Sequence, residues 1–104
     1  MGLLSFLFGN KPNPIKEILE QGATIIDVRT AGEFNSGHVD GAVNIPLNQI
    51  EHKIGKIKKM KSPYVLCCAS GARSASATSM LKSADIKDVY NGGSWFKVHR
   101  LMNN

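Results

Sequence analysis

The feature that most constrains the fold of this chain is an alternation between short apolar runs and segments with helical spacing. Strand-type runs are predicted at residues 23–28, 38–46, 64–67 and 86–90. Helical segments are predicted around them, at residues 14–22, 30–36, 50–60, 74–83 and 94–101. Such alternation is typical of an α/β fold, a parallel sheet with helices on both faces. Ligands of such sheets bind beyond the carboxyl ends of the strands.

Several residues mark where these elements begin and end. Asn13 followed by Pro14 is a helix start, because Asn caps well and Pro suits the first helical position. Thr30 and Glu33 have the spacing of a capping box. Ser94 is placed to cap the last helix, after an expected turn at residues 91–93.

Length and composition indicate one globular domain. The chain has 104 residues, 42% of them hydrophobic and 20% charged, which is unlike a disordered protein. We divide it into an apolar N-terminal segment, residues 1–12, and a domain at residues 13–104, which at this size can stand as a monomer. The net charge of +5 favours anionic partners. Nucleic-acid binding is not expected, because no recognition motif is present and the lysines cluster in one segment.

The N-terminal segment contains a short apolar run at residues 3–8. It is far below the roughly 20 residues that span a bilayer, so no transmembrane segment is expected. The basic start and the longer apolar stretch of a signal peptide are also missing. Packing on the domain or on a partner, and contact with a membrane surface, both remain open.

The stretch CCASGARSASA, residues 67–77, contains the candidate reactive residues. After a buried strand the chain must turn sharply into a helix, and small residues let backbone N–H groups point inward toward a cysteine sulfur. Together with the helix N-terminus, these groups would stabilise a thiolate nucleophile. The candidate site is Cys68 as the catalytic nucleophile, with substrate-binding residues Ala69, Ser70, Gly71, Ala72, Arg73 and Ser74. Arg73 would orient an oxyanion with its planar fork, and the hydroxyl of Ser74 would donate to the sulfur.

The spacing Cys68-x-x-Gly71-x-Arg73-Ser74 resembles the active loop of the rhodanese family. Four further motifs follow that family's pattern, namely IIDVRT at 25–30, EF at 33–34, GHVDGAVNIP at 37–46 and YNGG at 90–93 with Trp95. The resemblance covers roughly residues 13–101. It implies a single-domain rhodanese-like fold, with a parallel sheet of about five strands and helices on both faces.

The resemblance also implies an activity. A sulfurtransferase of this kind moves sulfane sulfur from a small anionic donor such as thiosulfate to Cys68, as a persulfide, and then to cyanide or a cellular thiol. This chemistry needs no metal and no organic cofactor. Two adjacent cysteines make no disulfide scaffold, which favours a reducing, cytoplasmic compartment. The Lys- and Asn-rich composition hints at a bacterial source.

Two alternatives stay beside this interpretation. Cys67 to Arg73 spells Cys-x5-Arg, the spacing of phosphatases and arsenate reductases, but Ser70 stands where that pattern has Gly, and Cys67 continues a buried strand. The second alternative is a rhodanese-like module that only binds a partner. Such modules commonly lack the cysteine or the arginine of the loop, whereas this chain keeps both.

For the other polar and aromatic residues we favour structural roles over functional ones. We expect Asp27 and Arg29 to make a structural contact, an ion pair with Glu33 or a cap. We expect His38 to be structural, and residues 95–96 to belong to the core. The lysines at positions 53–61 form a solvated face by default. A more specific hypothesis is that these lysines form a docking surface for an acidic sulfur-carrier protein.

Overall fold

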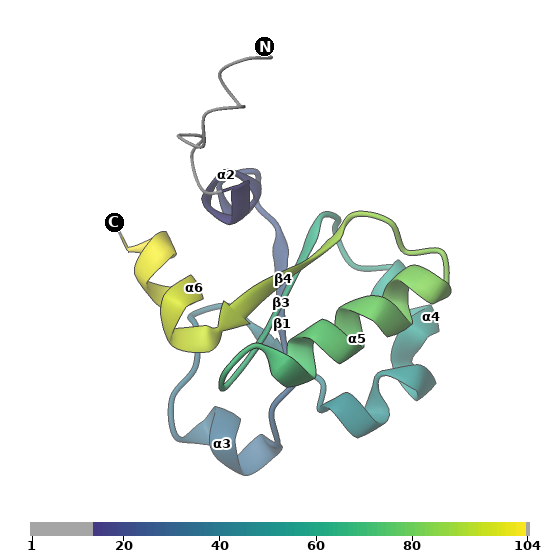
Figure 1. Ribbon diagram of the computed structural model, residues 1–104, viewed down its shortest axis with the longest axis horizontal. Helices are drawn as coiled ribbons and strands as arrows, with labels where there is room; N and C mark the ends of the chain where they lie inside the picture. The colour runs from purple at the N-terminus through teal and green to yellow at the C-terminus, as the bar shows by residue number, and fades with distance from the viewer. Residues whose placement is uncertain (1–13, 104) are drawn as a thin grey trace.

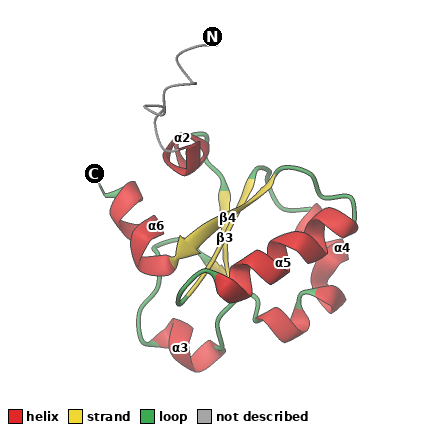
Figure 2. Ribbon diagram, in the orientation of Figure 1, coloured by secondary structure: helices red, strands yellow, loops and turns green. Residues whose placement is uncertain are grey.

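The computed structural model describes residues 14–103, in which a parallel sheet lies between two layers of helices (Figures 1 and 2). The strands are β1 (Thr24–Asp27), β2 (Val43–Asn44), β3 (Tyr64–Cys68) and β4 (Val89–Ser94). Their order in the sheet is β2-β1-β3-β4, and every neighbouring pair is parallel. The helices are α2 (Pro14–Glu20), α3 (Ala31–Asn35), α4 (Ile54–Lys58), α5 (Ala72–Ser83) and α6 (Trp95–Met102), with 3-10 turns η1 (Leu47–Gln49) and η2 (Glu51–Lys53).

The predicted α/β class is confirmed, and the predicted strand number is corrected. Residues 14–103 form four strands rather than about five, because this part of the chain contains four strand-type runs. The N-terminal segment, residues 1–12, lies outside the described residues. Within them, no helix combines the length and the apolar content that crossing a membrane requires.

Both faces of the sheet are covered, as predicted (Figure 1). Side chains alternate along a strand, so Ile26 and Leu66 pack on the face covered by α4 and α5. Ile25 and Val65 point to the opposite face of the sheet, where they pack in a second cluster with Ile18 of α2 and with α6. The two hydrophobic clusters hold the strand ends rigidly, which fixes the position of whatever follows β3.

The end of β4 differs from the prediction. We expected a turn at residues 91–93, but these residues continue the strand to Ser94. Leu66 pairs with Asn91 and Cys67 with Gly93, so Gly92 is the extra residue of a bulge. Gly92 is required there, because a Cβ on it would lie 2.7 Å from Cγ1 of Val65. The bulge brings β4 and the start of α6 close to the end of β3.

Two other predicted elements are shorter than expected. The strand predicted at residues 38–46 is reduced to Val43–Asn44. The helix predicted at residues 50–60 breaks into η2 and α4, because Lys53 leaves helical geometry with φ −111° and ψ 10°. Two of the predicted helix caps are confirmed: Thr30 and Glu33 form the capping box of α3, and the Ser94 hydroxyl accepts from the Lys97 N–H. The predicted cap at Asn13 lies outside the described residues.

Candidate functional site

The loop between β3 and α5 turns on Gly71. This residue has φ +106°, a left-handed conformation that favours glycine. A Cβ at this position would also approach Cα of Gly93 to 3.3 Å. The loop therefore turns within three residues of Cys68, and α5 begins at Ala72.

The sulfur of Cys68 lies inside this turn and accepts hydrogen bonds from two backbone N–H groups. The N–H of Gly71 is 3.0 Å from Sγ, the N–H of Ser74 is 3.4 Å from it, and the Ser74 hydroxyl oxygen is also at 3.4 Å. Burial opposes ionisation of Cys68, but hydrogen bonds from Ser74, Gly71 and the Ser70 N–H outweigh it and lower the pKa of the thiol. The geometry therefore favours a thiolate.

The other small residues of the predicted loop form its outer surface. Ala69, Ser70 and Ala72 are exposed, whereas Ser74 is buried beside the sulfur. Cys68 itself has no exposed surface.

Cys67 occupies a different environment. It faces the cluster formed with α2 and α6, on the opposite side of the sheet from Cys68. Burial, and then the nearby charge of Asp27, raise the pKa of Cys67 to about 12. A thiol that stays protonated at neutral pH is a poor nucleophile, so the structure does not favour the phosphatase or arsenate-reductase register that begins at Cys67.

Asn91 braces the loop from β4, a role that the sequence interpretation missed. Its Nδ2 donates to the Gly71 carbonyl at 3.1 Å, and its Oδ1 accepts from the Ser74 hydroxyl at 2.6 Å. Oδ1 also accepts from the N–H of Gly93 at 3.0 Å. The YNGG motif was the available signal, but its distance of 23 positions from Cys68 gave no sign of contact.

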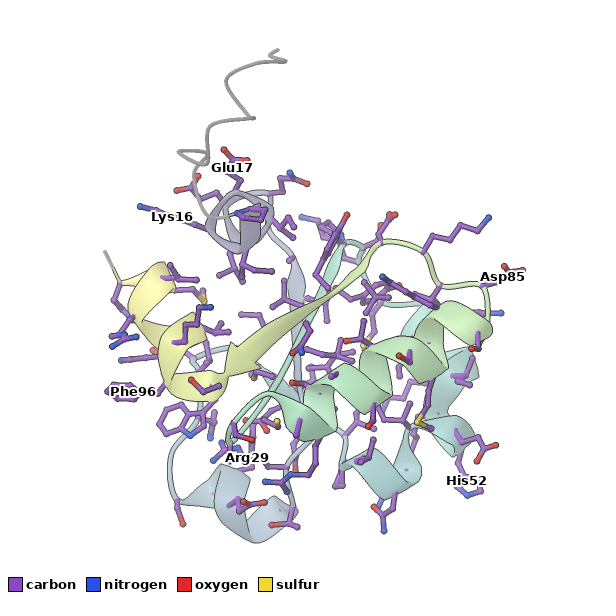
Figure 3. The ribbon with its side chains drawn as sticks, viewed as in Figure 1. Lys16, Glu17, Arg29, His52, Asp85 and Phe96 are labelled. Atoms are coloured by element: carbon purple, nitrogen blue, oxygen red, sulfur yellow. The ribbon has the colours of Figure 1, made fainter. Side chains whose placement is uncertain are left out.

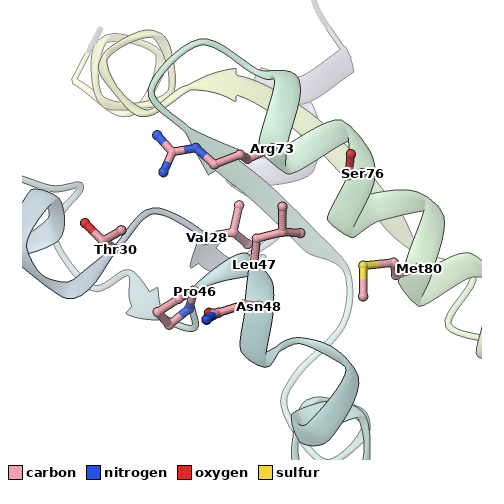
Figure 4. Close-up of a pocket in the computed structure, with 8 residues that line it drawn as sticks. All are labelled: Val28, Thr30, Pro46, Leu47, Asn48, Arg73, Ser76 and Met80. Atoms are coloured by element: carbon pink, nitrogen blue, oxygen red, sulfur yellow. The ribbon is translucent and has the colours of Figure 1, made fainter.

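Arg73 points away from the loop toward α3. Its Nη1 and Nη2 donate to Oε1 and Oε2 of Glu33 at 2.8 and 3.0 Å, in a bidentate ion pair (the guanidinium is visible in Figure 4). The pair is about one-third exposed on each side. The hydrogen bonds from Arg73, and then that from the Thr30 N–H, lower the pKa of Glu33 to about 2. The predicted role of Arg73 in orienting an anion stays a prediction.

Asp27 and Arg29 pair with each other at the end of β1. Arg29 Nη2 donates to Asp27 Oδ2 at 2.7 Å, and both residues are buried. The guanidinium also donates to the Gly37 carbonyl and lies 4.9 Å from the centroid of the Trp95 ring. We expected an ion pair with the Glu33 carboxylate, but Asp27 and Arg29 pair with each other instead. This pair fixes the chain between β1 and α3 (Figure 3 labels Arg29).

Two aromatic predictions have different outcomes. His38 stacks on Phe34 with ring centroids 3.7 Å apart, and its Nδ1 lies 2.7 Å from the Phe34 carbonyl, in line with a structural role. Trp95 packs against the core, but Phe96 is 53% exposed, so its assignment to the core was wrong (Figure 3).

A groove of about 490 Å³ lies beside the loop (Figure 4). Its lining is mainly apolar, and Arg73 stands at its edge. The apolar lining comes from Val28, Pro46, Leu47 and Met80, and Thr30, Asn48 and Ser76 add polar groups. Val28 lines the groove and also packs in the same hydrophobic cluster as Cys68. The two residues are neighbours because the residues before them, Asp27 and Cys67, pair in the sheet.

The comparisons with known proteins define the family. The family model described as "Rhodanese-like domain" matches residues 11–99, so the chain belongs to the rhodanese-like domain family. The chain is 33% identical over 89 residues to the thiosulfate sulfurtransferase GlpE of Pseudomonas savastanoi, covering 86% of this chain and 83% of the relative. A solved rhodanese with anions from E. coli matches with a TM-score of 0.67 and 28% identity, covering 72% of this chain and 89% of that one.

A longer relative is also similar. The YqhL protein of Bacillus subtilis is 39% identical over 75 residues, which cover 72% of this chain. The matched region spans only 59% of that protein's length.

Proposed function

We propose that this protein is a sulfurtransferase that carries sulfane sulfur as a persulfide on Cys68. The observation that carries the proposal is the set of hydrogen bonds to Sγ from the N–H groups of Gly71 and Ser74. These donors stabilise negative charge on sulfur, which a thiolate needs for attack and an ionised persulfide also carries.

The reaction has two steps. The Cys68 thiolate attacks the outer sulfur of a donor such as thiosulfate, the S–S bond of the donor breaks, and sulfite leaves with the electron pair. Cyanide or a cellular thiol then attacks the outer sulfur of the persulfide and restores the thiolate. The matching thiosulfate sulfurtransferase GlpE supports this donor class by its name. A purely binding role is less favoured, because a binding module does not require an activated thiol.

Partners and location belong to the same proposal. The described cysteines are free thiols, which suits a reducing cytoplasm. An acidic sulfur-carrier protein could use the exposed lysines at positions 56, 58, 59 and 61. However, these lysines precede β3, whereas Cys68 ends it, about 13 Å further along the strand. A carrier docked on the lysines must therefore extend along the sheet to reach the sulfur.

Thiocyanate formation from thiosulfate and cyanide tests the proposal. The wild-type protein is expected to turn over, and Cys68→Ser is expected to be inactive. Cys67→Ser, the matched control, is expected to keep most of the activity. Equal activity of wild type and Cys68→Ser would reject Cys68 as the sulfur carrier.

A further inference from the structure

The outer face of α6 carries Phe96, an aromatic side chain that the proposed chemistry does not use. Phe96 is 53% exposed and lies on the outer side of the helix (Figure 3). Arg100 follows about one helical turn later, and its Cζ lies 5.6 Å from the centroid of the Phe96 ring. Lys97 is exposed next to them. We call these three residues the α6 patch.

The cations of the α6 patch have no carboxylate partner. The other two arginines of the chain, Arg29 and Arg73, each pair with a carboxylate. Neither Arg100 nor Lys97 forms an ion pair among residues 14–103. A guanidinium that lies over an aromatic ring can still donate hydrogen bonds from its edge to a carboxylate. The patch therefore combines an apolar ring with positive charge that is available to an incoming anion.

The carboxylates on the elements packed around α6 leave this charge unpaired. Glu17 and Glu20 are exposed on α2, and Glu20 lines a small hollow with Met102, the last residue of α6. Asp40 is exposed in the loop whose Val39 packs in the same hydrophobic cluster as α6. None of these three carboxylates forms an ion pair within residues 14–103. The helix itself contains no acidic residue.

The α6 patch borders the loop that holds Cys68. Cys68 pairs with Ser94, the residue that caps α6, so one strand spacing of about 4.8 Å separates the two backbones. A Cβ on Gly93 would lie 3.8 Å from Cδ of Lys97, which places the Lys97 side chain beside the end of β4. The exposed residues of the loop, positions 69, 70 and 72, have small side chains. A polypeptide bound to the patch can therefore pass over the loop without a steric barrier.

We propose that the α6 patch is a docking surface for an acidic protein segment, which places an aliphatic side chain on the Phe96 ring and carboxylates on Lys97 and Arg100. Aromatic and arginine side chains are enriched among the residues that dominate protein interfaces. A lipid surface is less favoured, because the apolar face of α6, with Trp95 and Val98, packs in the core and cannot enter a bilayer.

The docked partner brings its own cysteine to the loop, and this part of the inference rests on the proposed function. The partner thiolate attacks the outer sulfur of the Cys68 persulfide and forms a new S–S bond with it. The S–S bond to Cys68 breaks, and its electron pair returns to the Cys68 sulfur. The step consumes no oxidant or reductant. The lysines before β3, by contrast, lie at the opposite end of the strand from Cys68.

The test uses a fluorescein-labelled peptide in which glutamate and leucine alternate and which ends in cysteine. A second peptide with glutamine in place of every glutamate is the matched control. The variants are Phe96→Ala and Arg100→Gln, both at exposed positions where folding is expected to be unchanged. Lys59→Gln removes the same charge from an exposed lysine that follows α4.

Fluorescence anisotropy measures the dissociation constant of each peptide at low salt. The wild-type protein is expected to bind the acidic peptide more tightly than the glutamine peptide, and high salt should remove the difference. Arg100→Gln is expected to weaken binding of the acidic peptide about two- to fivefold, the range of an exposed ion pair. Phe96→Ala is expected to weaken it by about fivefold or more, and Lys59→Gln should leave it unchanged.

The remaining outcomes reject either the docking surface or the proposed function. Equal affinities for the two peptides, or an equal loss in Lys59→Gln, would overturn the docking surface. Binding of phosphatidylserine vesicles without peptide binding would overturn it in favour of a lipid surface. A dimer in sedimentation that Phe96→Ala dissociates would replace the partner by a second copy of this chain. Peptide binding without any sulfur transfer from Cys68, measured by mass spectrometry, would keep the docking surface and reject the proposed function.

Discussion

Cys67 and Cys68 are adjacent in the chain, yet their side chains pack on opposite faces of the sheet. The strand alternation directs Cys68 toward α5 and its N-terminal amides, and it directs Cys67 toward α2 and α6. One thiol is activated by hydrogen bonds and the other is kept protonated by burial. The difference in their chemistry therefore follows from the period of a β-strand.

Ser74→Ala tests the hydroxyl contact to the sulfur. The hydroxyl donates to Asn91 and can donate to the thiolate only by turning toward it, so its loss is expected to raise the pKa of Cys68 and to slow alkylation by iodoacetamide at pH 7 by less than about tenfold, below the effect of a full hydrogen bond to a charged group. Ser79→Ala, an exposed position on the same helix, is the control and should leave the rate unchanged. Equal rates in wild type and Ser74→Ala would show that the backbone donors suffice.

Asp27→Asn tests the buried ion pair. The substitution removes the charge that compensates Arg29, so the free energy of unfolding is expected to fall by roughly 3–5 kcal/mol. Asp40→Asn, on an exposed residue, should change it by less than about 0.5 kcal/mol. Urea unfolding of both variants measures the difference, and similar midpoints would contradict a structural role for the pair.

Gly92→Ala tests the close approach of β4 to its neighbours. The added methyl group would lie 2.7 Å from Val65 Cγ1 and 2.9 Å from Val98 Cγ2, which is expected to cost about 1–3 kcal/mol of stability. Gly55→Ala in α4 has open space around it and is expected to stabilise the protein by up to about 1 kcal/mol. Thermal unfolding compares the two, and a neutral Gly92→Ala would contradict the packing described.

The pH dependence of stability tests the environment of Cys67. Its pKa is raised in the folded state to about 12, so the folded protein keeps a proton that the unfolded chain loses above about pH 8.5. The resulting stability is complete below pH 8.5 and is lost as the pH rises toward 12. Cys67→Ala should show a smaller loss of stability over this window than wild type, and an equal loss would contradict the account.

The sequence predicted the fold class and the place of the site because both depend on local signals. The apolar runs gave the strands, and the small residues after Cys68 gave the turn that exposes backbone N–H groups. The contacts of Glu33 with Arg73 and of Asn91 with Ser74 were not predicted, because they join residues 40 and 17 positions apart. The continuation of β4 through Gly92 was missed because glycines in sequence indicate a turn as readily as a bulge.

The proposal that Cys68 carries sulfane sulfur is tested most directly by intact mass and peptide mapping after incubation with a sulfane-sulfur donor. The account predicts a gain of one sulfur atom, located on Cys68, that is removed by cyanide and is absent from Cys68→Ser. Sulfur found on Cys67, or a gain of mass that persists in Cys68→Ser, would contradict it.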